Sequence, residues 1–258
     1  MNEERLRQAL DARQVVYGTW VQTPSPEMVE IIGWSGWDFV ILDLEHGAYG
    51  SEKLPHLIRA AEAAQAAPLV RVPLNAGHDV GKALDLGAVG IVAPGVTSGA
   101  AAEAVVRLTR FPPKGSRGAS PSTRQLHYSG VPFASLTAEG ALQPLVVVQV
   151  EAQLATSDLG SILDIAGLSV IFIGPYDLST SLGLAGQFEH PKVRGAISEI
   201  VSQAAGRNMA VGIWAPDAAS ARFWVEQGVR FITVSNNELM LFNVSTALRR
   251  AVESRPPS

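Results

Sequence analysis

Short apolar runs alternate with longer amphipathic stretches along nearly the whole chain. Runs of this length that are apolar almost throughout are typical of strands covered on both faces. β-branched and aromatic residues, which favour strands, are frequent in them. The predicted strands are Val15–Gln22, Phe39–His46, Pro68–Leu74, Val89–Pro94, Leu145–Val150, Val170–Ile173, Ala210–Trp214 and Phe231–Ser235.

The stretches between these runs carry apolar residues at helical spacing. In the clearest case Ser25 is expected to be an N-cap, with Pro26 in the first helical position. Ser51 is likewise expected to cap a helix, and Asp217 or Pro216 to begin one. Phe111–Val131 breaks the alternation and is predicted to be irregular. The other helices are expected over the polar N-terminal segment, Val80–Leu86, Ala100–Thr109, the stretch holding Leu154 and Ile165, about Lys192–Gly206, and about Glu238–Val252.

Eight strand–helix alternations in about 250 residues describe a single (β/α)₈ TIM barrel spanning residues 1–258. A doubly wound open sheet is the alternative. That fold would more naturally carry a Gly-rich turn after its first strand, where this chain has Thr23-Pro24-Ser25-Pro26. Neither a GxGxxG nor a Walker A sequence occurs. The pattern therefore favours the barrel.

Composition removes several classes of function. The chain has no Cys, which excludes disulfides, thiolate nucleophiles and Cys-bound metals. The net charge of −4 comes without a basic stripe, so no nucleic-acid partner is expected. No apolar run approaches the roughly 20 residues that span a bilayer, and the charged N-terminus does not resemble a secretory signal. These features predict a cytoplasmic protein with no membrane partner.

Two acids follow neighbouring predicted strands. Glu151 comes directly after Leu145–Val150, and Asp177 follows Val170–Ile173. The helix between these strands makes them parallel, so their carboxyl ends share one side of the sheet. Two carboxylates without Cys favour Mg²⁺ or Mn²⁺, with Co²⁺ also compatible. Open positions on such a cation suit a 2-oxo acid that chelates through two oxygens.

Other polar groups are predicted at the same end of the barrel. Gln149 alternates with Glu151 on one strand face, so it should lie one layer deeper in the lumen. His46 follows a strand and can take and give a proton near neutral pH; a surface or capping role is its alternative. Arg71 lies within a strand and either pairs with Asp43 or stabilises an oxyanion. A structural alternative is that Gln149, Glu151 and Arg71 only plug the barrel.

The positions of the four lysines bear on the type of catalysis. Lys53, Lys82, Lys114 and Lys192 all fall outside the predicted strands. A Schiff-base aldolase needs a desolvated amine in the barrel, so an enolate here would need a metal. The last two strands also lack Gly-rich ends of the kind that bind phosphate, which makes a phosphorylated substrate unfavourable.

Seven segments carry a resemblance to a known family, and it covers about Val16 to Leu248. The matching segments, in order, are GTW (Gly18–Trp20), DFVILDLEHG (Asp38–Gly47), VRVP (Val70–Pro73), LDLGA (Leu84–Ala88), RFPPKGSRG (Arg110–Gly118), VQVE (Val148–Glu151) and FIGPYDLS (Phe172–Ser179). In these segments the chain resembles the HpcH/HpaI aldolases, the metal-dependent (class II) pyruvate aldolases.

The resemblance implies roles for the residues at matching positions. It implies metal ligation by Glu151 and Asp177, with His46 as the catalytic base and Arg71 stabilising the transition state. Asp85 is implied to raise the basicity of the histidine. It implies substrate binding by Gln149 and the backbone at Tyr176. Asp177, Trp20 and Trp214 are further predicted substrate-binding residues.

The resemblance also implies a homo-oligomer, a hexamer in which the last helix is exchanged between barrels. Asp85 is predicted at the amino end of its own barrel, opposite His46. We therefore expect Asp85 to act on the His46 of a neighbouring subunit. Tyr176, Trp214 and Asn236-Asn237 depart from the family pattern, which leaves the aldehyde partner open.

The sequence thus predicts an aldolase that cleaves or forms 4-hydroxy-2-oxo acids from pyruvate and an aldehyde. One rival is a citrate-lyase-β-like enzyme using a CoA thioester on the same scaffold, which the lack of an evident basic pocket disfavours. A second rival is a non-catalytic protein that binds 2-oxo acids, for which His46 and Asp85 would be superfluous.

Overall fold

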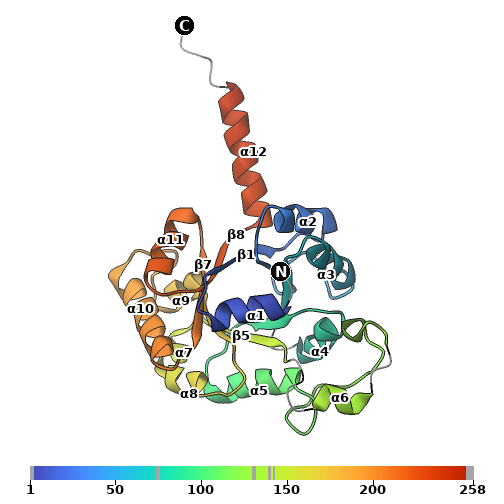
Figure 1. The fold of residues 1–258 in the computed structure, drawn as a ribbon. Coiled ribbons are helices and arrows are strands. Elements are labelled where there is room, and N and C mark those ends of the chain that lie inside the picture. The colour runs from blue at the N-terminus through green and yellow to red at the C-terminus, as the bar shows by residue number, and fades with distance from the viewer. Residues whose placement is uncertain (1–2, 74–75, 130–131, 139–140, 142, 254–258) are drawn as a thin grey trace.

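A computed structural model describes residues 3–73, 76–129, 132–138, 141 and 143–253, without the side chains of 133, 136, 153 and 154. Eight parallel strands form a closed barrel in the order β1-β2-β3-β4-β5-β6-β7-β8, surrounded by helices (Figure 1). The TIM barrel prediction is therefore confirmed, and the open-sheet alternative is wrong. The strands are β1 (Val16–Val21), β2 (Phe39–Asp43), β3 (Ala67–Arg71), β4 (Gly90–Ala93), β5 (Leu145–Val150), β6 (Val170–Ile173), β7 (Ala210–Ala215) and β8 (Phe231–Asn236).

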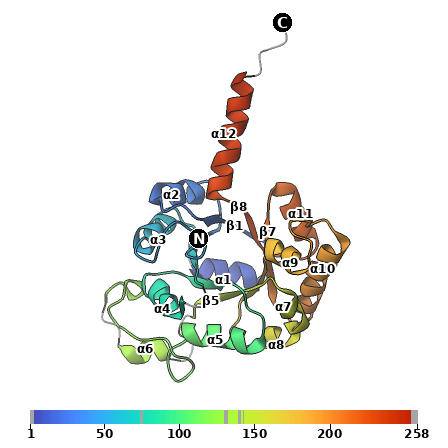
Figure 2. The same cartoon turned by 180° about the vertical axis from the view of Figure 1, so that it is seen from behind.

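Helices connect the strands and cover the outside of the barrel (Figures 1 and 2). They are α1 (Glu3–Asp11), α2 (Pro26–Trp34), α3 (Leu54–Ala63), α4 (Gly77–Asp85), α5 (Gly99–Thr109), η2 (Arg124–Leu126), α6 (Phe133–Thr137), α7 (Gln153–Ser157), α8 (Leu159–Leu163), α9 (Pro175–Ser181), α10 (Pro191–Gly206), α11 (Ala218–Glu226) and α12 (Asn237–Glu253).

Side-chain caps begin two of the helices as predicted. The Ser25 hydroxyl accepts a hydrogen bond from the Met28 amide at 3.2 Å, and Asp217 caps α11 in the same way. The predicted cap by Ser51 is wrong. Pro55 favours the first turn, so α3 begins at Leu54. The Ser51 hydroxyl instead accepts a hydrogen bond from Lys82 Nζ at 2.8 Å.

Four strands end earlier than predicted. β1 stops at Val21, β2 at Asp43, β3 at Arg71 and β4 at Ala93. Glu45 and His46 therefore lie in a loop. The predicted strand end at Leu74 and the end of the irregular passage at Val131 lie outside the described residues. The single helix expected between β5 and β6 is two short helices that meet at Asp158. Strand ends were therefore the least accurate part of the prediction.

Aromatic side chains fill the lumen toward its amino end. Phe39 and Phe231 stack with ring centroids 4.1 Å apart, and Phe172 meets Phe231 edge-on at 6.3 Å. Leu6 of α1 is fully buried against the same cluster. A Cβ on Gly18 would lie 2.3 Å from the Phe39 ring, so this position needs glycine. With the amino end packed by apolar groups, the polar lumen residues collect at the carboxyl end.

α12 points away from the barrel (Figures 1 and 2). Its contacts with the barrel concentrate on β1 and β8, close to its first residue. No helix in the described part of the chain is long and apolar enough to cross a membrane. Large apolar side chains of α12 nevertheless remain exposed, namely Leu241, Phe242, Val244, Leu248 and Val252.

Candidate active site

A buried ion pair joins the carboxyl ends of β2 and β3. Asp43 and Arg71 are direct register partners on these strands. Arg71 Nε donates to Asp43 Oδ1 at 2.8 Å and Nη2 donates to Oδ2 at 2.6 Å. Burial alone would raise the pKa of Asp43, but hydrogen bonds and charge from Arg71 hold it below its ordinary value. Asp43 is therefore a fixed negative charge that orients the guanidinium.

The remaining Arg71 donors face the lumen. Nη1 lies 3.1 Å from Glu45 Oε2 and 3.4 Å from Gln149 Oε1. The guanidinium carbon stands 4.4 Å from the centroid of a Trp20 ring. The Trp20 indole in turn donates to the Thr233 hydroxyl at 2.9 Å. The Trp20 ring thus packs against the Arg71 guanidinium, whose planar group is also held by Asp43, Glu45 and Gln149.

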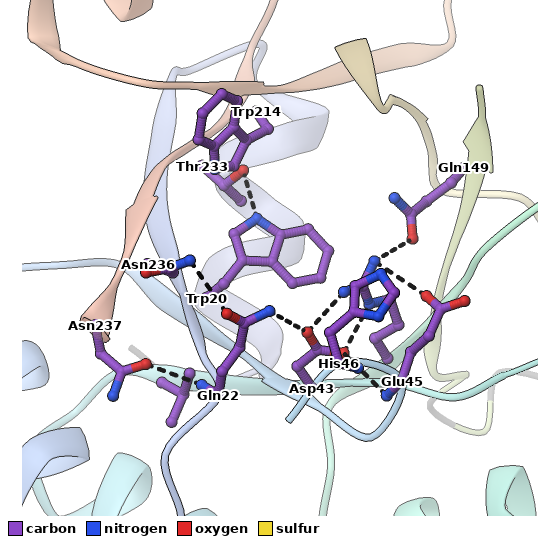
Figure 3. A network of polar contacts seen from close by, with 12 residues as sticks. Trp20, Gln22, Asp43, Glu45, His46, Gln149, Trp214, Thr233, Asn236 and Asn237 are labelled. Atoms are coloured by element: carbon purple, nitrogen blue, oxygen red, sulfur yellow. Dashed lines mark hydrogen bonds and ion pairs between the residues drawn. The ribbon is translucent and has the colours of Figure 1, made fainter. Parts of the chain in front are cut away.

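The loop after β2 places His46 beside this network (Figure 3). Asp43 Oδ1 accepts from the backbone amides of Glu45 and His46, at 3.0 and 3.2 Å. A side chain on Gly47 would collide with the Asp43 carbonyl at 2.1 Å, so the tight turn needs glycine. The His46 side chain is exposed, and none of the described residues hydrogen-bonds its ring. The imidazole is thus free to meet a substrate at the barrel mouth.

Glu151 lies next to this network, directly after β5. Its Oε1 accepts from the Gly95 amide at 2.7 Å, and its Oε2 accepts from Gln149 Nε2 at 3.2 Å. A Cβ on Gly174 would lie 2.5 Å from Oε2, so glycine there makes room for the carboxylate. Burial, aided by the charges of Asp177 and Glu45, raises the pKa of Glu151 to about 7. A cation would relieve this concentration of negative charge.

Asp177 comes from the first turn of α9 rather than from the end of β6 itself. Its side chain is exposed, and its charge acts on Glu151. No cluster of three or more His, Cys, Asp or Glu groups suited to a metal occurs among the described residues. Two carboxylates of this kind fit a hard divalent cation that keeps open positions for water or substrate.

Three aromatic rings lie on the β6–β7 side of the barrel. The Tyr176 ring is 4.7 Å from Phe188 and 4.9 Å from Trp214, measured between centroids. Trp214 Nε1 donates to the Ser235 carbonyl at 3.2 Å, which fixes the indole at the end of β7. Tyr176 and Trp214 were predicted from the sequence, whereas Phe188 was not.

Asp85 is separated from the other predicted site residues. It ends α4 and precedes β4, which places it at the amino end of the barrel, as the sequence predicted. Its carboxylate accepts from Arg117 Nη2 at 2.7 Å. Arg117 is buried, also donates to Gln125, and stacks on Phe111 with its guanidinium carbon 4.7 Å from the ring centroid.

Sequence reasoning assigned no role to several residues that support the site. Gln22 Nε2 donates to Asp43 Oδ2 at 2.9 Å, and Asn236 Nδ2 donates to Gln22 Oε1 at 3.1 Å (Figure 3). Tyr49 Oη accepts from the Asp43 amide at 2.9 Å and donates to the Val21 carbonyl at 2.8 Å. Burial raises the pKa of Tyr49, so it stays a neutral donor. Strand-end position pointed to Gln22 and Asn236, but no local signal pointed to Tyr49.

Two cavities lie at different ends of the barrel relative to the polar residues described above. A cavity of about 730 Å³ opens beside Arg124, Gln125, His127 and Tyr128, which lie toward the amino end. Arg124 there is already held by Glu62 and by the Leu86 carbonyl. A smaller cavity of about 270 Å³ lies beside Phe188 and Trp214. Of these two cavities, the smaller one adjoins the aromatic rings at the carboxyl end of the barrel.

Comparisons with known proteins agree with this geometry. The family model for HpcH/HpaI aldolase/citrate lyase matches residues 16–243. A 5-keto-4-deoxy-D-glucarate aldolase from Salmonella paratyphi C (strain RKS4594) is 34% identical over 242 residues, covering 94% of this chain and 93% of the relative.

Two solved structures are similar to this chain in both sequence and fold. An HpcH/HpaI aldolase/citrate lyase family protein from Burkholderia cenocepacia J2315 has 33% identity and a TM-score of 0.91, over 97% of this chain and 99% of that one. Citrate synthase SbnG has 30% identity and a TM-score of 0.83, over 96% and 97% of the two chains. The chain therefore belongs to the HpcH/HpaI aldolase/citrate lyase family and is a carbon–carbon lyase.

Proposed function

We propose that this protein is a class II pyruvate aldolase that cleaves or forms 4-hydroxy-2-oxo acids. The observation that carries the proposal is the position of Glu151, whose charge is crowded by Asp177 and Glu45. Gln149 links Glu151 to the buried guanidinium of Arg71. This arrangement offers a cation site and an anion site side by side, which is what a chelating 2-oxo acid requires.

Glu151 and Asp177 would hold the cation, and their oxygen donors favour Mg²⁺ or Mn²⁺, with Co²⁺ compatible. When bound, such a cation would polarise the 2-oxo group as a Lewis acid. Gly95 and Gln149 each occupy only part of the bonding capacity of the Glu151 oxygens, so both can stay in place. Their donated hydrogen bonds orient the carboxylate.

Arg71 and Gln149 would bind the pyruvyl part of the substrate. Arg71 is held rigidly by Asp43 and by the Trp20 ring, so its donors need not reorganise as negative charge develops. The amide at Tyr176 lies in the first turn of α9, where backbone donors are still available. These groups would stabilise the enolate of pyruvate.

His46 is the proposed base. In the cleavage direction it accepts the proton of the 4-hydroxyl group, the C3–C4 bond breaks, and the aldehyde forms. The electron pair of the broken bond passes to the enolate, which then takes a proton at C3. Synthesis runs the same steps in reverse.

The choice of an aldolase rests on the relatives as well as on the site. The Salmonella relative is named for 5-keto-4-deoxy-D-glucarate. That compound, numbered from its other end, is a 4-hydroxy-2-oxo acid whose aldol cleavage releases pyruvate. The reaction class carries over to this chain as a proposal, and the acid itself is left open.

A CoA-thioester enzyme is the alternative favoured by one observation, the likeness to citrate synthase SbnG. CoA carries phosphates that need accessible cations near the barrel mouth. Arg71, the arginine of this network, is buried against Asp43 and does not offer an accessible charge to a phosphate. We therefore favour an aldolase over a CoA-thioester enzyme. We also favour it over a non-catalytic protein that binds 2-oxo acids, because such a protein would not need His46.

We also propose that the working protein is an oligomer, a hexamer by the family resemblance, with α12 exchanged between barrels. The exposed apolar side chains of α12 support this, because an isolated helix with such residues in water gains stability by packing on a partner. Asp85 lies too far along the barrel for its own His46. Together with Arg117, which positions it, Asp85 would then act on the His46 of a neighbouring subunit.

Deuterium exchange tests the proposed function. With Mg²⁺ or Mn²⁺ in D₂O, the protein should exchange the methyl protons of pyruvate, and EDTA should stop it. Glu151→Gln should abolish exchange while leaving the fold intact. Absence of exchange by the wild type with each of Mg²⁺, Mn²⁺ and Co²⁺ would defeat the aldolase assignment.

A further inference from the structure

Three aromatic rings from separate segments meet beside the proposed metal ligand Asp177. Tyr176 lies in α9, Phe188 in the loop after it, and Trp214 in β7. Phe188 contacts Tyr176 edge-on at 4.7 Å and Trp214 at 6.5 Å, and Tyr176 is tilted against Trp214 at 4.9 Å, all between centroids. Because Tyr176 immediately precedes Asp177, this aromatic cluster begins next to one of the two proposed metal ligands.

A cavity of about 270 Å³ adjoins the cluster. It is large enough for a phenyl group, since an apolar cavity of about 150 Å³ can hold benzene. Most of its wall is apolar or aromatic, contributed by Pro175, Phe188, Ile197, Trp214, Phe223 and Trp224.

The two charged side chains in this wall pair with each other. Arg194 Nη2 contacts Glu189, and the Arg194 guanidinium lies 4.6 Å from the centroid of the Phe223 ring. Arg194 Nε is a buried donor without a hydrogen-bond partner among the described residues. A hydroxylated tail placed against this wall would give up hydrogen bonds to water and regain few. An apolar tail has no hydrogen bonds to water to give up, and it would bury the aromatic rings.

We propose that Tyr176, Phe188 and Trp214, with the cavity behind them, form the aldehyde subsite, and that it selects aldehydes with an aromatic or branched aliphatic tail over short hydroxylated ones. This inference rests on the proposed aldolase function. In the step concerned, C3 of pyruvate loses a proton and bonds to the aldehyde carbon, and the aldehyde oxygen gains a proton. Phe188 is the specificity-determining residue that the sequence did not reveal.

The test compares two aldehydes with pyruvate held constant. 3-Phenylpropanal has an unconjugated carbonyl and an aromatic tail, whereas D-glyceraldehyde is short and hydroxylated. Wild-type kcat/KM should favour 3-phenylpropanal by at least about tenfold, the scale on which apolar pockets discriminate small groups. Phe188→Ala should lower the ratio of the two kcat/KM values, 3-phenylpropanal over D-glyceraldehyde, about tenfold.

Trp34→Ala is the matched control, because Trp34 is an exposed aromatic residue at the end of α2 and outside this cavity. It should leave the preference unchanged. If Phe188→Ala does not fold, Phe188→Leu should keep the preference and Phe188→Gln should lose it.

Two results would overturn the subsite. One is a wild-type enzyme that exchanges pyruvate protons but does not prefer 3-phenylpropanal. The other is a Phe188 variant that loses activity equally with both aldehydes. If the wild-type enzyme does not exchange the methyl protons of pyruvate, the proposed aldolase function is wrong. Failure of the subsite and failure of the proposed function therefore give different results.

Discussion

Asp43 and Arg71, register partners on adjacent strands, form a two-point ion pair in which both side chains are almost completely buried. The pair has two consequences. It compensates a buried charge at the carboxyl end of the lumen, and it holds the guanidinium plane against Trp20. Stability and substrate binding therefore depend on the same contact.

Asp43→Asn should lower the free energy of unfolding by about 3–5 kcal/mol, because it leaves the Arg71 charge buried without its partner. Urea denaturation followed by circular dichroism measures this. Glu45→Gln is the control, since Glu45 contacts the same guanidinium from a more exposed position. That change should cost about 0–1 kcal/mol. Equal losses for the two variants would contradict the account.

The pH dependence of the metal-free protein should reflect Glu151. Its pKa is about 7 in the folded chain, mainly through burial, against 4.5 as the ordinary value. Between these values the folded chain holds a proton that the unfolded chain has released, so stability should fall as pH rises from 4.5 to 7. Thermal unfolding of the EDTA-treated protein across this range measures it. Glu151→Gln should flatten that part of the profile.

Cation binding should show the opposite trend with pH. A cation must displace the proton on Glu151, so Mn²⁺ affinity should rise about tenfold per pH unit below pH 7 and level off above it. Calorimetric titration at pH 5.5, 6.5 and 7.5 gives the slope. An affinity that is flat across this range would mean that Glu151 is not the group being displaced.

Gly174→Ala should weaken Mn²⁺ binding by at least tenfold with little effect on folding. The added Cβ would lie 2.5 Å from Glu151 Oε2 and force the carboxylate to move. Gly195→Ala in α10 is the matched control, because nothing lies within 4 Å of its Cβ position. Retention of full Mn²⁺ affinity by Gly174→Ala would place the cation away from Glu151.

Mixed oligomers test whether Asp85 acts between subunits. His46→Ala and Asp85→Asn should each lower kcat by at least about a hundredfold when pure. Reassembled together, they should regain activity, because some sites then combine an intact His46 with an intact Asp85 from a neighbour. No recovery in verified mixed oligomers would show that the two residues do not act across a subunit boundary.

The exposed face of α12 makes a separate prediction. Phe242→Asp combined with Leu248→Asp should produce a smaller species in analytical ultracentrifugation, because charges would replace the apolar contacts with a partner. Arg249→Glu on the same helix is the control for a general charge effect. An unchanged sedimentation coefficient for the double variant would argue against exchange of this helix.

Much of the fold follows from local pattern. The apolar runs place all eight strands, because strands covered on both faces must be apolar almost throughout. The N-caps Ser25 and Asp217 were also predicted from the sequence, since each accepts a hydrogen bond from an amide only three residues later. The predicted N-cap of α3 by Ser51 was wrong, because Ser51 and Pro55 lie about one turn apart and only one of these signals can set the start of the helix.

By itself the sequence determined the barrel and the polar residues at the carboxyl ends of its strands, since strand alternation and parallel topology suffice for both. It did not reveal Tyr49, which lies in a loop. The tertiary structure decided how those residues pair. Strand register brings Asp43 opposite Arg71, barrel closure brings Asn236 to Gln22, and loop packing brings Phe188 to Tyr176. These partners are far apart in sequence, and no local periodicity specifies which distant side chain a group will meet.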